Sequence, residues 1–89
     1  MPAVHLIIKG KVQGVFFRAS AKDKADDLGI KGWVKNTPEG DVEIMANGNQ
    51  MAVDEFIQWC RTGPSKAKVT SVDTRIVEEE DFTGFRITR

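Results

Sequence analysis

Polar and apolar residues alternate loosely at the start of the chain. Val4, Leu6 and Ile8 share one face of an extended segment, and a two-residue period is typical of a strand with one buried face. The pattern predicts a first strand over residues 4 to about 12, interrupted at Gly10.

The hydrophobic period then changes from that of a strand to that of a helix. Ala21, Ala25 and Leu28 recur at helical spacing, while most of the charged residues between them face water. Gly29 follows, and glycine commonly ends a helix in the left-handed conformation. These positions predict a first helix over residues 18–28.

Two short strand-like segments come next, at residues 30–35 and 41–46. Residues 36–40 separate them, and Pro38 and Gly40 suit the second and fourth positions of a type I turn. The two segments therefore predict a β-hairpin.

A second helix and two more strands complete the pattern. Asn49 suits the N-cap of a helix that should end at Gly63-Pro64. The apolar stripe of this helix consists of Val53, Phe56, Ile57 and Cys60. Alternation over residues 72–76 predicts a fourth strand, and residues 85–87 a short fifth strand after the acidic bend at residues 78–81.

The order of these elements indicates the fold class. Strand, helix, strand, strand, helix, strand, plus a short C-terminal strand, is the ferredoxin-like split βαβ sandwich, an α+β fold with two helices on one face of an antiparallel sheet. A chain of 89 residues suffices for a single domain, residues 1–89. Both strands of a strand-helix-strand unit run the same way, so residues 13–18 should lie beside residues 36–40.

Composition and charge narrow the possible partners. Apolar residues make up 40% of the chain and charged residues 29%, as in an ordinary soluble globular protein. Thirteen basic residues balance thirteen acidic ones, so the basic field that binds nucleic acid is missing. We expect no nucleic-acid partner, whereas one arginine and a few backbone amides suffice for a small phosphorylated ligand.

The single cysteine and single histidine carry little chemistry. Cys60 cannot form an internal disulfide, lies on an apolar stripe and is most simply a core residue, so we expect a reducing, cytoplasmic location. His5 has no other His or Cys near it in sequence, and we expect a structural histidine, no metal and no cofactor. The apolar residues 4–8 are too short for a signal peptide, and we expect no membrane association.

The loop at residues 13–18 has the features of an anion site. It enters a helix, where free N–H groups and the positive end of the dipole favour an anion, and Gly14 lets the backbone turn tightly. Arg18 stands at this helix start, where a cation is unfavourable unless an anion lies nearby. Two interpretations stay open: Arg18 binds an anion, or it is simply solvated.

Asn36 also has two interpretations. Turn chemistry alone accounts for an asparagine before Thr37 and Pro38, and on the residues alone this interpretation is favoured. The amide is nevertheless suited to catalysis, because its carbonyl can accept a hydrogen bond from a water while its NH₂ group donates to another oxygen.

Two segments resemble the signatures of the acylphosphatase family. The nine residues from Gly10 to Arg18, GKVQGVFFR, closely resemble the first signature. Residues 32–36, GWVKN, followed by residues 40–42, GDV, resemble the second, at the family's spacing. The likeness covers essentially the whole chain and is to the free-standing, common type of acylphosphatase.

The resemblance implies a metal-independent hydrolase that cleaves the carboxyl-phosphate bond of acyl phosphates to a carboxylate and inorganic phosphate. By resemblance, Arg18 and the loop amides would bind the phosphoryl oxygens, Asn36 would orient the attacking water, and Thr37 could support Asn36. The phosphate-binding loop would consist of Gln13, Gly14, Val15, Phe16, Phe17 and Arg18. The family also uses glycine at the position of Phe16.

A second hypothesis remains, because the same architecture also carries RNA-binding and regulatory modules. Residues 31–34 resemble an RNA-binding strand only faintly, since paired exposed aromatics and a basic surface are missing. A protein that binds phosphate-containing ligands without hydrolysing them is therefore the alternative to an enzyme. In either case we expect a monomer.

Overall fold

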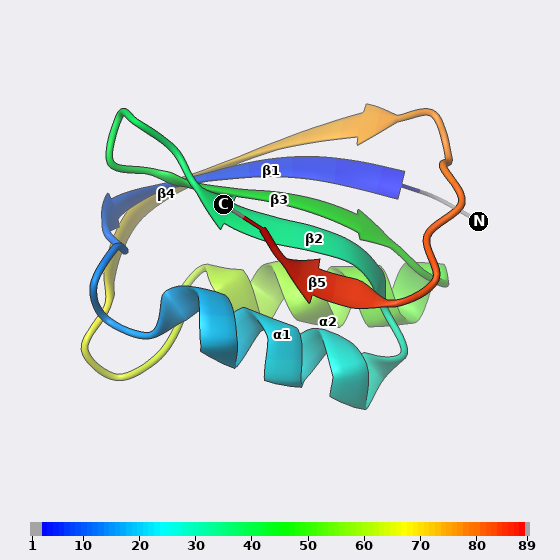
Figure 1. Ribbon diagram of the computed structural model, residues 1–89, viewed down its shortest axis with the longest axis horizontal. Coiled ribbons are helices and arrows are strands. Elements are labelled where there is room, and N and C mark those ends of the chain that lie inside the picture. Colours follow the sequence, from blue (N-terminus) through cyan, green and yellow to red (C-terminus); the bar gives the residue numbers. More distant parts are fainter. Residues whose placement is uncertain (1–2, 89) are drawn as a thin grey trace.

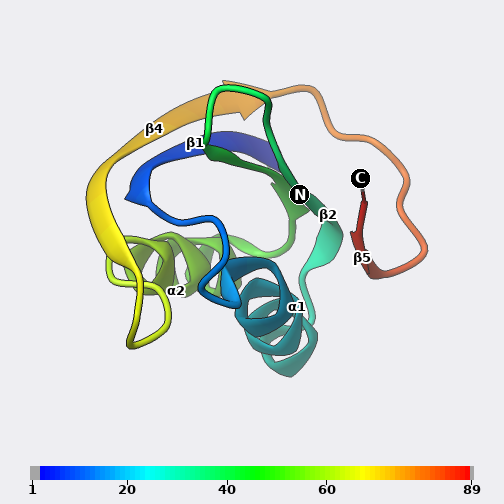
Figure 2. The same cartoon turned by 60° about the vertical axis from the view of Figure 1, so that its left-hand side comes forward.

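The computed structural model describes residues 3–88. Two helices lie side by side against one face of a five-stranded sheet, which curves over them (Figures 1 and 2). The elements in chain order are β1 (Ala3–Lys11), α1 (Phe17–Leu28), β2 (Lys31–Asn36), β3 (Val42–Asn47), α2 (Gln50–Cys60), β4 (Lys68–Val77) and β5 (Phe85–Ile87). This arrangement confirms the expected α+β, ferredoxin-like fold.

The order of strands in the sheet is β4-β1-β3-β2-β5. Strand β3 pairs antiparallel with both β1 and β2, and β4 pairs antiparallel with the outer side of β1. The short β5 instead joins β2 in parallel, so the sheet is mixed. The end of β4 and the start of β2 lie at the same end of the sheet, and the segment between β4 and β5 crosses that end before β5 runs alongside β2 (Figure 2).

Alternation in the central strands builds the core beneath the helices. Leu6 and Ile8 of β1 and Ile44 of β3 are fully buried, as is Phe56 of α2. Burying a side chain of this size contributes about 1.5–3 kcal/mol. Cys60 is buried with them, which confirms it as a core residue. The same burial raises the pKa of its thiol far above the usual range.

Both helices are present, with small differences at their ends. Gly29 caps α1 in the left-handed conformation, as predicted, and the side chain of Asn49 caps α2 by accepting a hydrogen bond from the Ala52 N–H at 2.8 Å. Helix α2 ends at Cys60, before the expected Gly63, because its last carbonyls bond to the N–H groups of a closing turn instead of another helical turn.

Strand β4 is longer than predicted, beginning at Lys68 and not near residue 72. It is an edge strand with mostly exposed side chains, and its backbone pairs with β1 along its whole length. Residues 68–71 can therefore form a strand without an apolar residue at every second position. For this reason the hydrophobic pattern of the sequence did not predict this part of β4.

Strands β2 and β3 approach each other too closely at Gly32 for a side chain. The φ of Gly32 is +143°, and a Cβ there would lie 1.8 Å from the carbonyl oxygen of Met45. We expect Gly32→Ala to lower the free energy of unfolding by about 3 kcal/mol or more, because the two strands would have to separate. Urea unfolding followed by circular dichroism measures this loss. Gly84→Ala is the control, since a Cβ there meets no atom within 4 Å; equal stability of the two variants would contradict the prediction.

Candidate active site

The loop before α1 and the turn after β2 meet at one edge of the sheet, as the strand-helix-strand order predicted. The side-chain Nε2 of Gln13 donates to the carbonyl oxygens of Thr37 at 2.9 Å and Asp41 at 2.8 Å. The turn itself closes through the Gly40 N–H, which donates to the Thr37 carbonyl at 3.2 Å. Gln13 therefore joins two segments that are far apart in sequence.

Alternate residues of the loop anchor it in the core. The side chains of Val15 and Phe17 are buried, and the Phe17 ring packs against Trp59 with ring centroids 5.4 Å apart. The backbone between these anchors turns sharply, because Gly14 and Phe16 both have a positive φ, +74° and +65°. The loop is thus a sharply turned backbone cradle, anchored in the core at the start of α1.

The backbone N–H groups of this cradle have no acceptor within the described part of the chain. No backbone or side-chain acceptor among residues 3–88 bonds the N–H groups of residues 14–19, and the first helical bond runs from the Ser20 N–H to the Phe16 carbonyl at 3.0 Å. The first turn of α1 contains no acidic residue to offset the helix dipole. Free donors and an uncompensated positive end together favour a bound anion.

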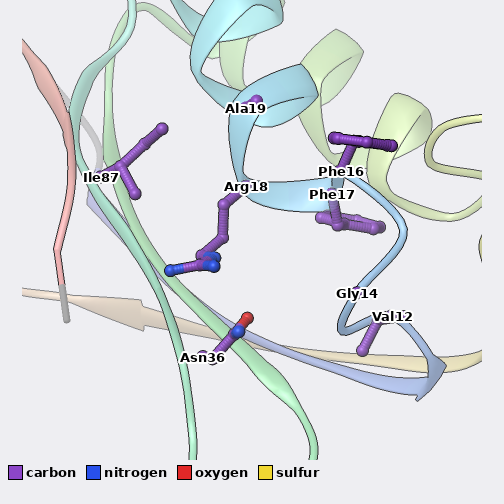
Figure 3. Close-up of a pocket in the computed structure, with 8 residues that line it drawn as sticks. All are labelled: Val12, Gly14, Phe16, Phe17, Arg18, Ala19, Asn36 and Ile87. Atoms are coloured by element: carbon purple, nitrogen blue, oxygen red, sulfur yellow. The ribbon is translucent and has the colours of Figure 1, made fainter.

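Arg18 and Asn36 lie on opposite sides of one cavity and point toward each other (Figure 3). The cavity has a volume of about 360 Å³. Its lining consists of Val12, Gly14, Phe16, Phe17, Arg18, Ala19, Asn36 and Ile87. Arg18 is half-buried, and no carboxylate among residues 3–88 forms an ion pair with it. A half-buried cation in a cavity fits an anion site better than simple solvation.

The turn chemistry ascribed to Asn36 is carried out by Thr37 instead. Thr37 Oγ1 accepts a hydrogen bond from the Asp41 N–H at 3.1 Å, and the Thr37 N–H donates to the Asp41 carbonyl at 2.9 Å. The Asn36 Oδ1 is buried, and no donor among residues 3–88 reaches it. Because a buried acceptor without a donor is costly, the Asn36 amide is better explained by the cavity than by the turn.

Three features of the site could not be read from the sequence. Gln13 was assigned to the loop, but its side chain works as a tie to the hairpin. Val15 and Phe17 use their side chains as core anchors, which leaves only their backbone N–H groups for a ligand. Ile87 of β5 lines the cavity, a placement that depends on the parallel pairing of β5 with β2. A contact between segments that are distant in the chain produces no local pattern in the sequence.

The described residues offer little that would hold a cation. Among residues 3–88, no group of three or more His, Cys, Asp or Glu side chains is arranged to hold a metal ion. His5 Nε2 lies 2.7 Å from Glu43 Oε2 in a neighbouring strand, so His5 is the structural histidine that was expected. None of the helices within residues 3–88 is both long and apolar enough to span a membrane.

Comparisons with known proteins agree on one family. The acylphosphatase family model matches residues 4–87. A curated acylphosphatase of Methylococcus capsulatus is 47% identical over an alignment of 90 positions, which covers 100% of this chain and 98% of that protein. The chain belongs to the acylphosphatase family, whose members are hydrolases acting on acyl phosphates.

Two solved acylphosphatase structures closely match the fold. The Bacillus subtilis acylphosphatase is 34% identical with a TM-score of 0.97, and the match covers 100% of both chains. The acylphosphatase of Coxiella burnetii is 40% identical with a TM-score of 0.95, and the match covers 98% of this chain and 92% of that one. The sequence-based assignment to the family is confirmed.

The two hydrogen bonds of Gln13 should contribute measurably to stability. We expect Gln13→Ala to lower the free energy of unfolding by about 1–3 kcal/mol, because two partly buried carbonyls of the hairpin lose their donor. Urea unfolding measures the change. Gln58→Ala is the matched control, since Gln58 is exposed on α2. A Gln13→Ala variant as stable as this control would show that the tie contributes nothing.

Proposed function

We propose that this chain hydrolyses the carboxyl-phosphate bond of acyl phosphates in the cavity between the loop at residues 13–18 and Asn36. One observation carries the proposal. Arg18 and Asn36 line the same cavity as four loop residues whose N–H groups have no acceptor among residues 3–88, namely Gly14, Phe16, Phe17 and Ala19. Within the same range, Arg18 has no ion-pair partner. These are positive or donating groups around a space that also holds a buried acceptor, which suits a phosphoryl group attacked by water.

Arg18 and the loop amides bind the phosphoryl oxygens. A guanidinium forms charge-assisted, bidentate hydrogen bonds to phosphate, and backbone N–H groups at a helix start add donors that need no reorganisation. The buried side chains of Val15 and Phe17 hold the loop backbone, and with it these donors, in place. Charge on the equatorial oxygens during phosphoryl transfer is therefore met by fixed groups.

Asn36 orients the attacking water. Its Oδ1 accepts a hydrogen bond from the water, while its NH₂ group donates to a second oxygen. The side chain comes from the end of β2 and faces Arg18 across the cavity (Figure 3), so a water held by Asn36 approaches a phosphorus held by Arg18. Thr37 supports Asn36 indirectly, because its two hydrogen bonds to Asp41 fix the turn that begins at Asn36.

The proposed hydrolysis needs neither a general acid nor a metal ion. A carboxylate leaves without prior protonation, so the site needs no proton donor for the leaving group. The proton of the attacking water passes to an oxygen of the substrate's own phosphate, and the products are a carboxylate and inorganic phosphate. The proposed enzyme works without a cofactor, and Arg18 supplies the positive charge that a metal ion supplies in other phosphoryl-transfer sites.

The chain is further proposed to act as a cytoplasmic monomer that does not bind nucleic acid. Its net charge is zero, so it lacks the basic field that holds polyanions. The only cysteine is buried and unpaired, as suits a reducing compartment. The substrate is then a small diffusible acyl phosphate.

Arg18→Ala should reduce both affinity and rate. We expect its kcat/KM for benzoyl phosphate to fall about 10²- to 10³-fold, with a raised KM, because the main positive charge on the phosphoryl group is lost. Hydrolysis is measured with a chelator present. Arg61→Ala, at an exposed arginine outside the cavity, is the control, and circular dichroism verifies folding. Full activity of folded Arg18→Ala, loss of wild-type activity in chelator, or binding without hydrolysis would each reject the mechanism.

Asn36→Ala should reduce mainly the rate. The substrate is held by Arg18 and the amides, so we expect kcat for benzoyl phosphate to fall about 10²-fold while KM changes little, because only the water loses its orientation. Steady-state kinetics separates the two constants. Thr37→Val is the comparison, since it keeps Asn36 and removes only the Oγ1 acceptor that supports the turn; it should lose less than about 10-fold. An Asn36→Ala variant that loses affinity but not rate would exclude the water-orienting role.

A further inference from the structure

The side chain of Phe16 is not explained by the stability of the fold. Its exposed fraction is 75%, whereas the neighbouring Phe17 is 1% exposed. Its φ of +65° makes Phe16 the only residue other than glycine with a positive φ within residues 3–88. A bulky side chain in this conformation costs about 1–3 kcal/mol, and glycine would avoid the cost. Neither burial nor backbone preference favours phenylalanine here.

The ring is held at the active-site cavity by its neighbours. Val15 and Phe17 on either side are buried, so the backbone cannot turn Phe16 into the core without removing them. The cavity lining includes both Phe16 and Arg18. Ile87 of β5, 43% exposed, lines the other side, and Arg18 lies between the two apolar residues (Figure 3). Two exposed apolar side chains thus flank the polar centre.

We propose that the ring of Phe16, together with Ile87, contacts the acyl group of the substrate and makes the enzyme prefer aromatic and other large apolar acyl groups over acetyl. This inference rests on the proposed function. With the phosphoryl group held by Arg18 and the loop amides, the acyl carbon is one bridging oxygen away from phosphorus. The acyl substituent must therefore extend away from the polar centre along the cavity wall. Phe16 and Ile87 form the exposed apolar part of that wall.

The size of the expected preference follows from the contact. An aromatic pair contributes a factor of about 2 to 10 beyond simple burial, and the methyl group of acetyl phosphate has far less apolar surface to bury against these side chains. Phe16 is therefore a specificity residue, since it touches the part of the substrate that varies between acyl phosphates. The phosphoryl group itself is bound by Arg18 and the loop amides.

The test compares kcat/KM for benzoyl phosphate with kcat/KM for acetyl phosphate in each variant. Phe16→Asn removes the ring but keeps a residue that adopts a positive φ readily, and Phe16→Gly is a second variant that removes the strain. We expect the benzoyl-to-acetyl ratio to fall about 2- to 10-fold in both, to fall less in Phe16→Leu, and to fall also in Ile87→Ala. Met51→Asn is the matched control, because Met51 is 85% exposed on α2 and lies outside the cavity.

The outcomes separate the two levels of inference. A ratio that stays at the wild-type value in folded Phe16→Asn and Phe16→Gly, while the wild type hydrolyses both substrates, would overturn the role of Phe16 and leave the proposed function standing. An equal loss on both substrates would also overturn it, because the residue would then serve only the loop. A wild-type protein that hydrolyses neither substrate would reject the proposed function and this inference together.

Discussion

The pairing of β3 with both β1 and β2 is the constraint on which the site depends. Val42 pairs with Ile8 on one side and with Asn36 on the other, so Asn36 is held level with Ile8 of β1. Because β3 is antiparallel to both neighbours, β1 and β2 are parallel to each other, and the segments that follow them leave the sheet at the same edge. The Gln13 hydrogen bonds then fix the distance between those segments.

The site concentrates positive and donating groups that have no partner among residues 3–88. Arg18 lies where the helix dipole already repels a cation, and the N–H groups of residues 14–19 bond to no acceptor within the range that the structure describes. Such a cluster does not stabilise the folded chain by itself, and the burial of Val15 and Phe17 holds it in place. Core packing therefore maintains an arrangement whose own electrostatics become favourable when an anion binds, which is the preorganisation that phosphoryl transfer requires.

The strained backbone of the loop serves the same end. Gly14 and Phe16 both adopt a positive φ, and turns that include left-handed residues are the backbone from which anion-binding nests are built. Glycine meets this demand without strain at Gly14, whereas Phe16 meets it with a side chain exposed beside the cavity. The conformation thus belongs to the backbone cradle of the loop, and the aromatic ring is an addition to it.

Local pattern in the sequence determined the elements, their order and the loop that enters α1, because strand and helix periods, Gly29 and Asn49 act within a few residues of themselves. Resemblance added the family and the roles proposed for Arg18 and Asn36. Only the tertiary structure decided the parallel place of β5, the extent of the edge strand β4, the tie from Gln13 and the presence of Ile87 at the cavity. Each of these depends on backbone or side-chain contacts between segments distant in the chain, and such contacts leave no periodic trace in the residues that make them.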